Sequence, residues 1–350
     1  MRKLLFKLHL YVALAAGVFV VMLGITGAIM AFEPEIDRVL HWKLSYVTPS
    51  GHTLSVAEIR AAVERQFPGE RIAAYGLEAA PNLSWSVLLR RGQVFVNPYT
   101  GEALGVREGG MDLLGYVHQL HLRLLWRSRS DPGKKIVSWA GVAMLFLLFS
   151  GLYLWWPVKR VTIQRGMSPR RFWYDLHSAA GIFSGVFLLA LTVTGLIIGF
   201  DETTGPLLYK MTGSQPSQMP DPPAGPPPGA RPITPDQAIA IARDALPGAT
   251  PFLIIVPGPK GAYQVRCRYP EDLTPGGRSR VLVDQYRGAI LFAEGSRAAP
   301  AGTRLVNANR ALHTGDIFGI PSKAVMSLAS LMAVVQVVSG AMLWWRKSRR

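Results

Sequence analysis

Residues 8–32 read LHLYVALAAGVFVVMLGITGAIMAF, and residues 176–200 read LHSAAGIFSGVFLLALTVTGLIIGF. When the two are aligned without a gap, about ten of the twenty-five positions are identical. Each stretch is apolar and long enough to cross the roughly 30 Å hydrocarbon core of a bilayer as one helix. The chain therefore begins each of its halves with a related membrane-spanning segment.

A second pair of apolar stretches follows the same pattern. Residues 132–156 align with residues 321–345, and both end in Ser-Gly, two further residues and Leu-Trp-Trp. Between the paired stretches, residues 94–101 (VFVNPYTG) resemble residues 281–288 (VLVDQYRG). The order membrane helix, outer domain, membrane helix is thus written twice. It predicts a four-helix transmembrane bundle built from a parallel tandem repeat.

The composition also favours a membrane protein. Of the 350 residues, 49% are hydrophobic and 17% are charged, yet the net charge is +16. The single cysteine, Cys267, excludes intramolecular disulfide bonds and thiolate metal clusters. Basic residues flank the apolar stretches on one side, which the positive-inside rule makes cytoplasmic. They are Arg2, Lys3, Lys7, Lys159, Arg160, Arg165, Arg170, Arg171, Arg346, Lys347, Arg349 and Arg350. We therefore expect no nucleic-acid partner, and a retained first helix rather than a cleaved signal peptide.

The same patterns divide the chain into segments. We expect membrane helices at 1–32, 132–157, 175–200 and 321–346, a cytoplasmic loop at 158–174, a cytoplasmic tail at 347–350, periplasmic α+β domains at 33–131 and 233–320, and a Pro-rich linker at 201–232. The N- and C-termini then lie in the cytoplasm of a bacterial cell, and two large loops lie in the periplasm.

Local patterns in the outer segments predict helices and strands. They favour helices at 54–67 and 234–246 and strands at 85–89, 93–96, 262–269 and 280–284. The linker sequence favours an extended chain because of Pro222, Pro223, Pro226, Pro227 and Pro228. Glycines within the apolar stretches either let helices approach closely or leave room for a flat group between them.

Four of the seven histidines fall at repeat-related positions. His9 and His177 occupy the same position of the first and third apolar stretches, at their cytoplasmic ends. His121 and His313 precede the second and fourth stretches by similar intervals, which puts a second pair near the outer face. Two imidazoles on opposite helices can hold a haem iron on the axis of a bundle. Zinc is disfavoured, because each pair supplies two nitrogens with no cysteine or well-placed carboxylate beside it.

The motifs quoted above have a family likeness. The Leu-His starts, the Thr-Gly pairs at 26–27 and 194–195, the Tyr-x-Gly strand endings and the Ser-Gly-x-x-Leu-Trp-Trp helix ends together resemble the PepSY-associated transmembrane family over nearly the whole chain. The resemblance implies PepSY-type outer domains, two b-type haems, and an inner-membrane reductase that releases iron from ferric siderophores in the periplasm. Carried over to this sequence, the axial ligands are His9, His121, His177 and His313.

His118 departs from this pattern, because its counterpart in the second half is not a histidine. It lies three residues before His121, so both can share one helix face but cannot easily bind opposite sides of one iron. Two roles stay open for it. His118 replaces His121 as the ligand, or it forms a hydrogen bond to a propionate or proton donor near the outer haem.

The expected activity is transfer of electrons across the membrane to a ferric siderophore or another Fe³⁺ chelate. The sequence has no Gly-x-Gly-x-x-Gly following a strand, so a membrane quinol or a separate cytoplasmic reductase must supply the electrons. Two other classes compete with this expectation. One is a non-enzymatic membrane protein whose PepSY domains bind or inhibit a periplasmic protein, and the other is a transporter whose parallel repeats enclose a path.

Overall fold

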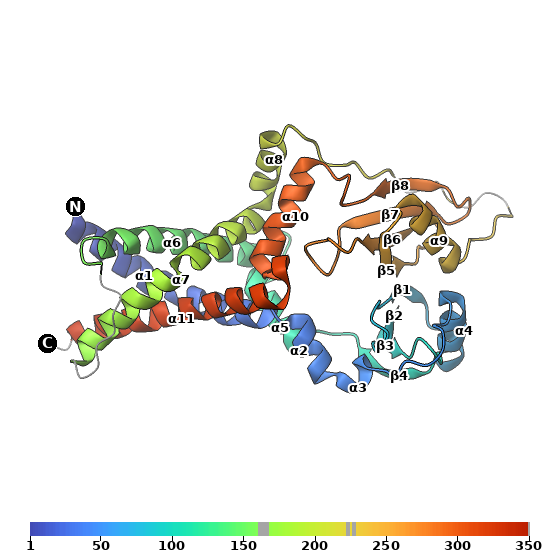
Figure 1. The fold of residues 1–350 in the computed structure, drawn as a ribbon, viewed down its shortest axis with the longest axis horizontal. Coiled ribbons are helices and arrows are strands. Elements are labelled where there is room, and N and C mark those ends of the chain that lie inside the picture. The colour runs from blue at the N-terminus through green and yellow to red at the C-terminus, as the bar shows by residue number, and fades with distance from the viewer. Residues whose placement is uncertain (160–167, 222–224, 226–228, 349–350) are drawn as a thin grey trace. The chain divides into compact units, whose positions relative to one another are not determined.

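The computed structural model describes residues 1–159, 168–221, 225 and 229–348. Among the residues singled out above, those outside the described part are Arg160, Arg165, Arg349, Arg350, Pro222, Pro223, Pro226, Pro227 and Pro228. The chain forms two compact units. Figure 1 shows the fold, coloured from blue at the N-terminus to red at the C-terminus. The helical unit comprises Met1–Glu33, Asp112–Leu208 and Ala308–Arg350, and the sheet unit comprises Pro34–Met111 and Tyr209–Asn307.

Four helices of the helical unit are long and apolar enough to cross a bilayer. They are α1 (Arg2–Met30), α6 (Pro132–Trp155), α7 (Pro169–Gly199) and α11 (Ile320–Ser348). Helices α1 and α7 each pack against both α6 and α11, so the four close into a ring. Both α6 and α7 begin with a proline at their first position, which suits a residue without a backbone N–H. Because α7 begins at Pro169, the end of the loop expected at 158–174 is helical.

Shorter helices precede or follow the long ones along the chain. They are α5 (Leu113–Arg123), α8 (Asp201–Met211), α10 (Ala301–Thr314) and the 3₁₀ turn η1 (Asp316–Phe318). The linker expected at 201–232 is wrong in its first part, because residues 201–211 form helix α8. Helix α5 packs against α1 and α6. It belongs to the helical unit, as do the residues from 308 onward, so the outer domains expected at 33–131 and 233–320 are shorter than predicted.

The sheet unit is built on one antiparallel sheet of eight strands in the order β4-β3-β2-β1-β5-β6-β7-β8. The strands are β1 (Ile72–Gly76), β2 (Trp85–Leu89), β3 (Gly92–Val96), β4 (Ala103–Glu108), β5 (Thr250–Ile255), β6 (Ala262–Arg268), β7 (Ser279–Asp284) and β8 (Ile290–Glu294). Strand β1 pairs with β5 in the middle, with Tyr75 opposite Ile254. The two halves of the chain therefore share one sheet, where two separate domains were expected.

Two helices of equal length pack on this sheet, α4 (Val56–Gln66) and α9 (Pro235–Ala245). Each begins with a capping box, Ser55 with Glu58 and Thr234 with Gln237, which explains where the helices start. Their apolar faces join the buried valines of the sheet in one core, and such burial contributes about 1.5–3 kcal/mol per large side chain. Two short helices, α2 (Glu33–Leu40) and α3 (Trp42–Ser45), precede α4. The helices and strands expected in the outer segments are confirmed as α4, α9, β2, β3, β6 and β7.

Candidate functional site

His9 on α1 and His177 on α7 come from helices at alternate positions of the four-helix ring. Nδ1 of His9 lies 2.8 Å from Oγ of Ser150 on α6. Nδ1 of His177 lies 3.0 Å from Oγ of Ser339 on α11. The two histidines are close enough for their charges to interact. The structure thus brings together the first pair that the sequence singled out.

His121 on α5 and His313 on α10 have equivalent surroundings. Nδ1 of His121 lies 2.8 Å from Oγ1 of Thr26 on α1, and Nδ1 of His313 lies 3.0 Å from Oγ1 of Thr194 on α7. Burial, followed by the charges of His313 and His118, lowers the pKa of His121 to about 3. Burial also lowers the pKa of His313 to about 4. Both rings are therefore neutral at physiological pH, as a metal ligand must be.

Each of these four histidines rests on a hydroxyl residue followed directly by a glycine, which we call a hydroxyl–glycine seat. The seats are Ser150-Gly151 for His9, Ser339-Gly340 for His177, Thr26-Gly27 for His121 and Thr194-Gly195 for His313. A Cβ atom added to the four glycines, in that order, would lie 3.4, 3.3, 3.2 and 3.0 Å from Cε1 of the ring. At Gly340, Gly27 and Gly195 these contacts are tighter than an ordinary Cβ contact, so the glycine makes room for the imidazole while the hydroxyl holds it. At Gly151 a Cβ would lie at ordinary contact distance.

The glycines of the apolar stretches therefore have different roles. Those of the seats accommodate histidine rings. Gly24 instead lets α1 approach α11, because a Cβ there would lie 2.8 Å from the carbonyl oxygen of Ser330. Within the described part of the chain, no atom lies within 4 Å of a Cβ added to Gly185 on α7.

His118 has a different environment from the four seated histidines. Its Nδ1 lies 2.9 Å from Oε2 of Glu33, and about a third of each of the two side chains is exposed. Its charge acts on His121, so the two lie near each other on α5. A carboxylate holds Nδ1 of His118 as a hydroxyl holds Nδ1 of His121, and ligating histidines commonly bond a carboxylate in this way, so both roles expected for His118 stay predictions.

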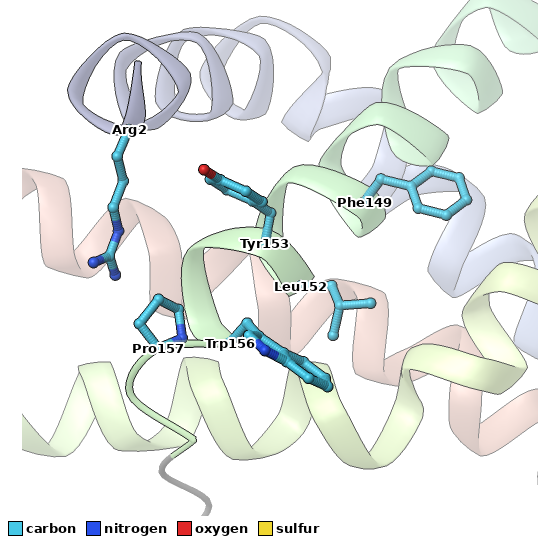
Figure 2. A pocket seen from close by; sticks show the side chains of 6 residues that line it. All are labelled: Arg2, Phe149, Leu152, Tyr153, Trp156 and Pro157. Carbon is cyan, nitrogen blue, oxygen red and sulfur yellow. The ribbon is translucent and has the colours of Figure 1, made fainter.

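A cavity of about 360 Å³ lies at the start of α1 and the end of α6. Figure 2 shows the side chains that line it: Arg2, Phe149, Leu152, Tyr153, Trp156 and Pro157. The guanidinium of Arg2 donates a hydrogen bond of 3.0 Å to the carbonyl oxygen of Leu154. The lining is mainly apolar and includes no histidine, so this cavity is separate from the two histidine pairs.

The seated histidines suit haem better than a bare metal ion. Among the described residues, no group of three or more His, Cys, Asp and Glu side chains could hold a metal ion. In the same part of the chain, the contacts of the four seated rings engage Nδ1 and leave Nε2 without a hydrogen-bond partner. Haem iron takes two axial ligands from the protein, because its macrocycle supplies the other four donors. Each pair therefore offers the number and kind of ligand that a b-type haem requires.

The seats are the part of the site that sequence reasoning missed. The Ser-Gly and Thr-Gly pairs were recognised only as repeated motifs. The available signal was that four of these pairs match between the two repeats, 26–27 with 194–195 and 150–151 with 339–340, as the histidines do. Which seat serves which histidine depends on helix packing, and no spacing along the chain gives that information.

A ring of four membrane-spanning helices with two histidine pairs, together with a separate antiparallel sheet region, defines a multi-pass membrane protein with an α+β portion. The chain belongs to the family described as the PepSY-associated TM region, and the match covers residues 6–347. No curated protein matches the chain.

Proposed function

We propose that the protein is a di-haem oxidoreductase of the bacterial inner membrane that reduces ferric iron held in a siderophore or another chelate. The observation that supports this proposal is the presence of two histidine pairs, each ring seated in the same way on a different helix of the four-helix ring. A transporter or a purely structural bundle has no need for four such seats.

Each histidine pair would hold one b-type haem, which supplies single-electron exchange when bound. His9 and His177 serve one haem, and His121 and His313 serve the other. The protein's own contribution is to fix the rings, keep them away from water and hold them at two depths. Thr26 follows His9 by 17 residues on α1, and Thr194 follows His177 by the same number on α7. At about 1.5 Å per residue, the two levels lie roughly 25 Å apart, close to the thickness of a bilayer core.

The direction of transfer follows from the proposed orientation. By the positive-inside rule, basic residues such as Arg2, Lys3 and Arg170 favour a cytoplasmic side for the His9–His177 level and a periplasmic side for the His121–His313 level. With haem bound, the first level would face a quinol or a cytoplasmic reductase as electron donor, and the second level would face the ferric chelate. Ferrous iron binds hard oxygen ligands more weakly than ferric iron does, so reduction releases it from the chelate.

The proposal is tested by mixing reduced protein with its substrate in the absence of oxygen. Full-length protein, purified in detergent and reduced with dithionite, is mixed with a ferric hydroxamate chelate in the presence of a chelator specific for Fe²⁺. The expected result is reoxidation of the haem spectrum together with Fe²⁺ capture. The same hydroxamate loaded with Ga³⁺ is the matched control, because Ga³⁺ does not accept the electron.

Two results would count against the proposal. Haems that stay reduced with both hydroxamate and catecholate chelates of Fe³⁺ would contradict a ferric-chelate reductase. A preparation that binds no haem would instead favour the class in which the PepSY domains bind or inhibit a periplasmic protein.

A further inference from the structure

The hydroxyl groups of the four seats are themselves donors to their own helices. Thr26 and Thr194 donate from Oγ1 to the carbonyl oxygens of Met22 and Ala190, at 2.7 and 2.6 Å. Ser150 and Ser339 donate from Oγ to the carbonyl oxygens of Phe146 and Val335, at 2.7 and 2.6 Å. A hydroxyl carries one hydrogen and two lone pairs, so each of these oxygens has only acceptor capacity left for the histidine.

The proton of each imidazole must therefore lie on Nδ1. A neutral ring carries one N–H, and only a donor can bond an oxygen whose own hydrogen is already used. His177 supplies an independent check, because its Nδ1 also lies 3.0 Å from the backbone carbonyl oxygen of Gln336, a group that only accepts. In all four rings the lone pair is consequently left on Nε2.

We propose that Thr26, Ser150, Thr194 and Ser339 are positioning residues that hold the four histidines as Nδ1–H tautomers and present Nε2 to the haem irons. The proposal rests on the proposed haem ligation and deepens it, since it names the ligating atom and the groups that choose it. The seat glycine fixes where the ring lies, and the hydroxyl fixes which nitrogen carries the proton.

The same hydrogen bond should also affect the reduction potential of the haem iron. When Nδ1–H donates to an acceptor, the ring becomes a stronger electron donor at Nε2, and ligand basicity rises. A more basic ligand favours ferric over ferrous iron and lowers the reduction potential. Removing the acceptor oxygen should therefore shift the potential of the affected haem to a more positive value.

The chain offers matched controls for this test. Thr192 lies on α7 two residues before Thr194, and its hydroxyl donates to the carbonyl oxygen of Leu188 at 2.7 Å without reaching a histidine among the described residues. Ser184, also on α7, donates in the same way to Ala180 at 2.6 Å. Thr194→Val is therefore compared with Thr192→Val, and Ser339→Ala with Ser184→Ala. The serine variants serve as a second test if Thr194→Val does not fold.

The first readout is a redox titration of the full-length protein with haem bound. The expected result is a positive shift for one haem in Thr194→Val and in Ser339→Ala, no shift in either control, and return towards the original value in Thr194→Ser. Unchanged potentials in both seat variants would overturn the proposal.

The second readout needs no haem. Protein labelled with ¹⁵N-histidine and prepared haem-free should show an Nδ1–H tautomer for the seated rings, and Thr194→Val should change the tautomer signal of one of them. If the seated rings carry their proton on Nε2, the inference fails even when the protein binds haem normally. If the tautomers are as proposed but the wild-type protein never binds haem, the proposed function fails instead.

Discussion

At the scale of residues, the main feature is the contact of each paired histidine with a serine or threonine hydroxyl. Burying a histidine costs free energy unless its ring nitrogens form hydrogen bonds. In each of the four paired histidines, Nδ1 contacts the hydroxyl of one serine or threonine. The repeat in the sequence singled out these four histidines as candidate ligands. It could not predict the seats, because a hydroxyl in a helix commonly bonds to its own carbonyl four residues earlier, and its second contact exists only in three dimensions.

The seat glycines give the first prediction. Gly195→Val should displace the ring of His313, because even a Cβ at this position would lie 3.0 Å from Cε1 of that ring. We expect the haem content to fall from two per chain to one, measured from the pyridine haemochrome and the protein concentration. Gly185→Val is the matched control on the same helix, since no atom of the residues that the structure describes lies within 4 Å of its added Cβ. Two haems in Gly195→Val would show that the glycine is not needed for the imidazole.

Cys267 gives a prediction about the sheet unit. The side chain is fully buried, and burial raises the pKa of its thiol to about 11. We expect almost no reaction with a maleimide at pH 8 until denaturant unfolds the sheet. Since the unfolded thiol ionises near pH 9, its contribution to stability is complete below that pH and is lost as the pH rises from about 9 to 11. Rapid labelling of native protein would contradict this burial.

At the scale of elements, the two halves are joined by a helix cap as well as by the pairing of β1 with β5. Asp236 on α9 accepts hydrogen bonds from the backbone N–H groups of Val56 and Ala57 on α4, both at 2.8 Å. The first turn of α4 is thus capped by a residue from the other half of the chain. A carboxylate at a helix N-terminus is also favoured by the helix dipole.

Asp236→Ala should therefore loosen the start of α4. We expect a loss of about 1–2 kcal/mol in the free energy of unfolding of the sheet unit, the usual effect of removing an N-cap. Hydrogen exchange of the peptide containing Val56 and Ala57 should speed up in this variant. Asp244→Ala, an exposed change near the other end of α9, is the control and should exchange at the original rate. Equal protection in both variants would show that the cap is not important.

The elements also show why sequence reasoning succeeded in part. Strands β2, β3, β6 and β7 have alternating burial that a pattern of period two reveals, whereas the edge strand β4 is half-buried along most of its length. Helix α8 was missed because Gly205 and Pro206 are signals for a break, yet Pro206 lies inside this helix. Helix α5 has 11 residues, as α4 and α9 do, and its assignment to the helical unit depends on packing against α1 and α6.

At the scale of the whole molecule, the orientation in the membrane can be tested directly. Because Cys267 is buried, a single added cysteine can be labelled selectively. We expect Glu102→Cys, exposed in the sheet unit, to react with a membrane-impermeant maleimide in spheroplasts, and Lys3→Cys, exposed at the start of α1, to react only after the membrane is opened. The reversed pattern would invert the proposed direction of electron transfer.

Haem content, measured for purified wild-type protein and for its single His→Ala variants, tests whether one chain holds two haems through two histidine pairs. We predict two b-type haems per wild-type chain. His9→Ala and His177→Ala should each lose the same haem, and His121→Ala and His313→Ala should each lose the other. His118→Ala should keep both. Wild-type protein without haem, when produced with adequate haem supply, or a loss of haem from His118→Ala but not from His121→Ala, would contradict the account.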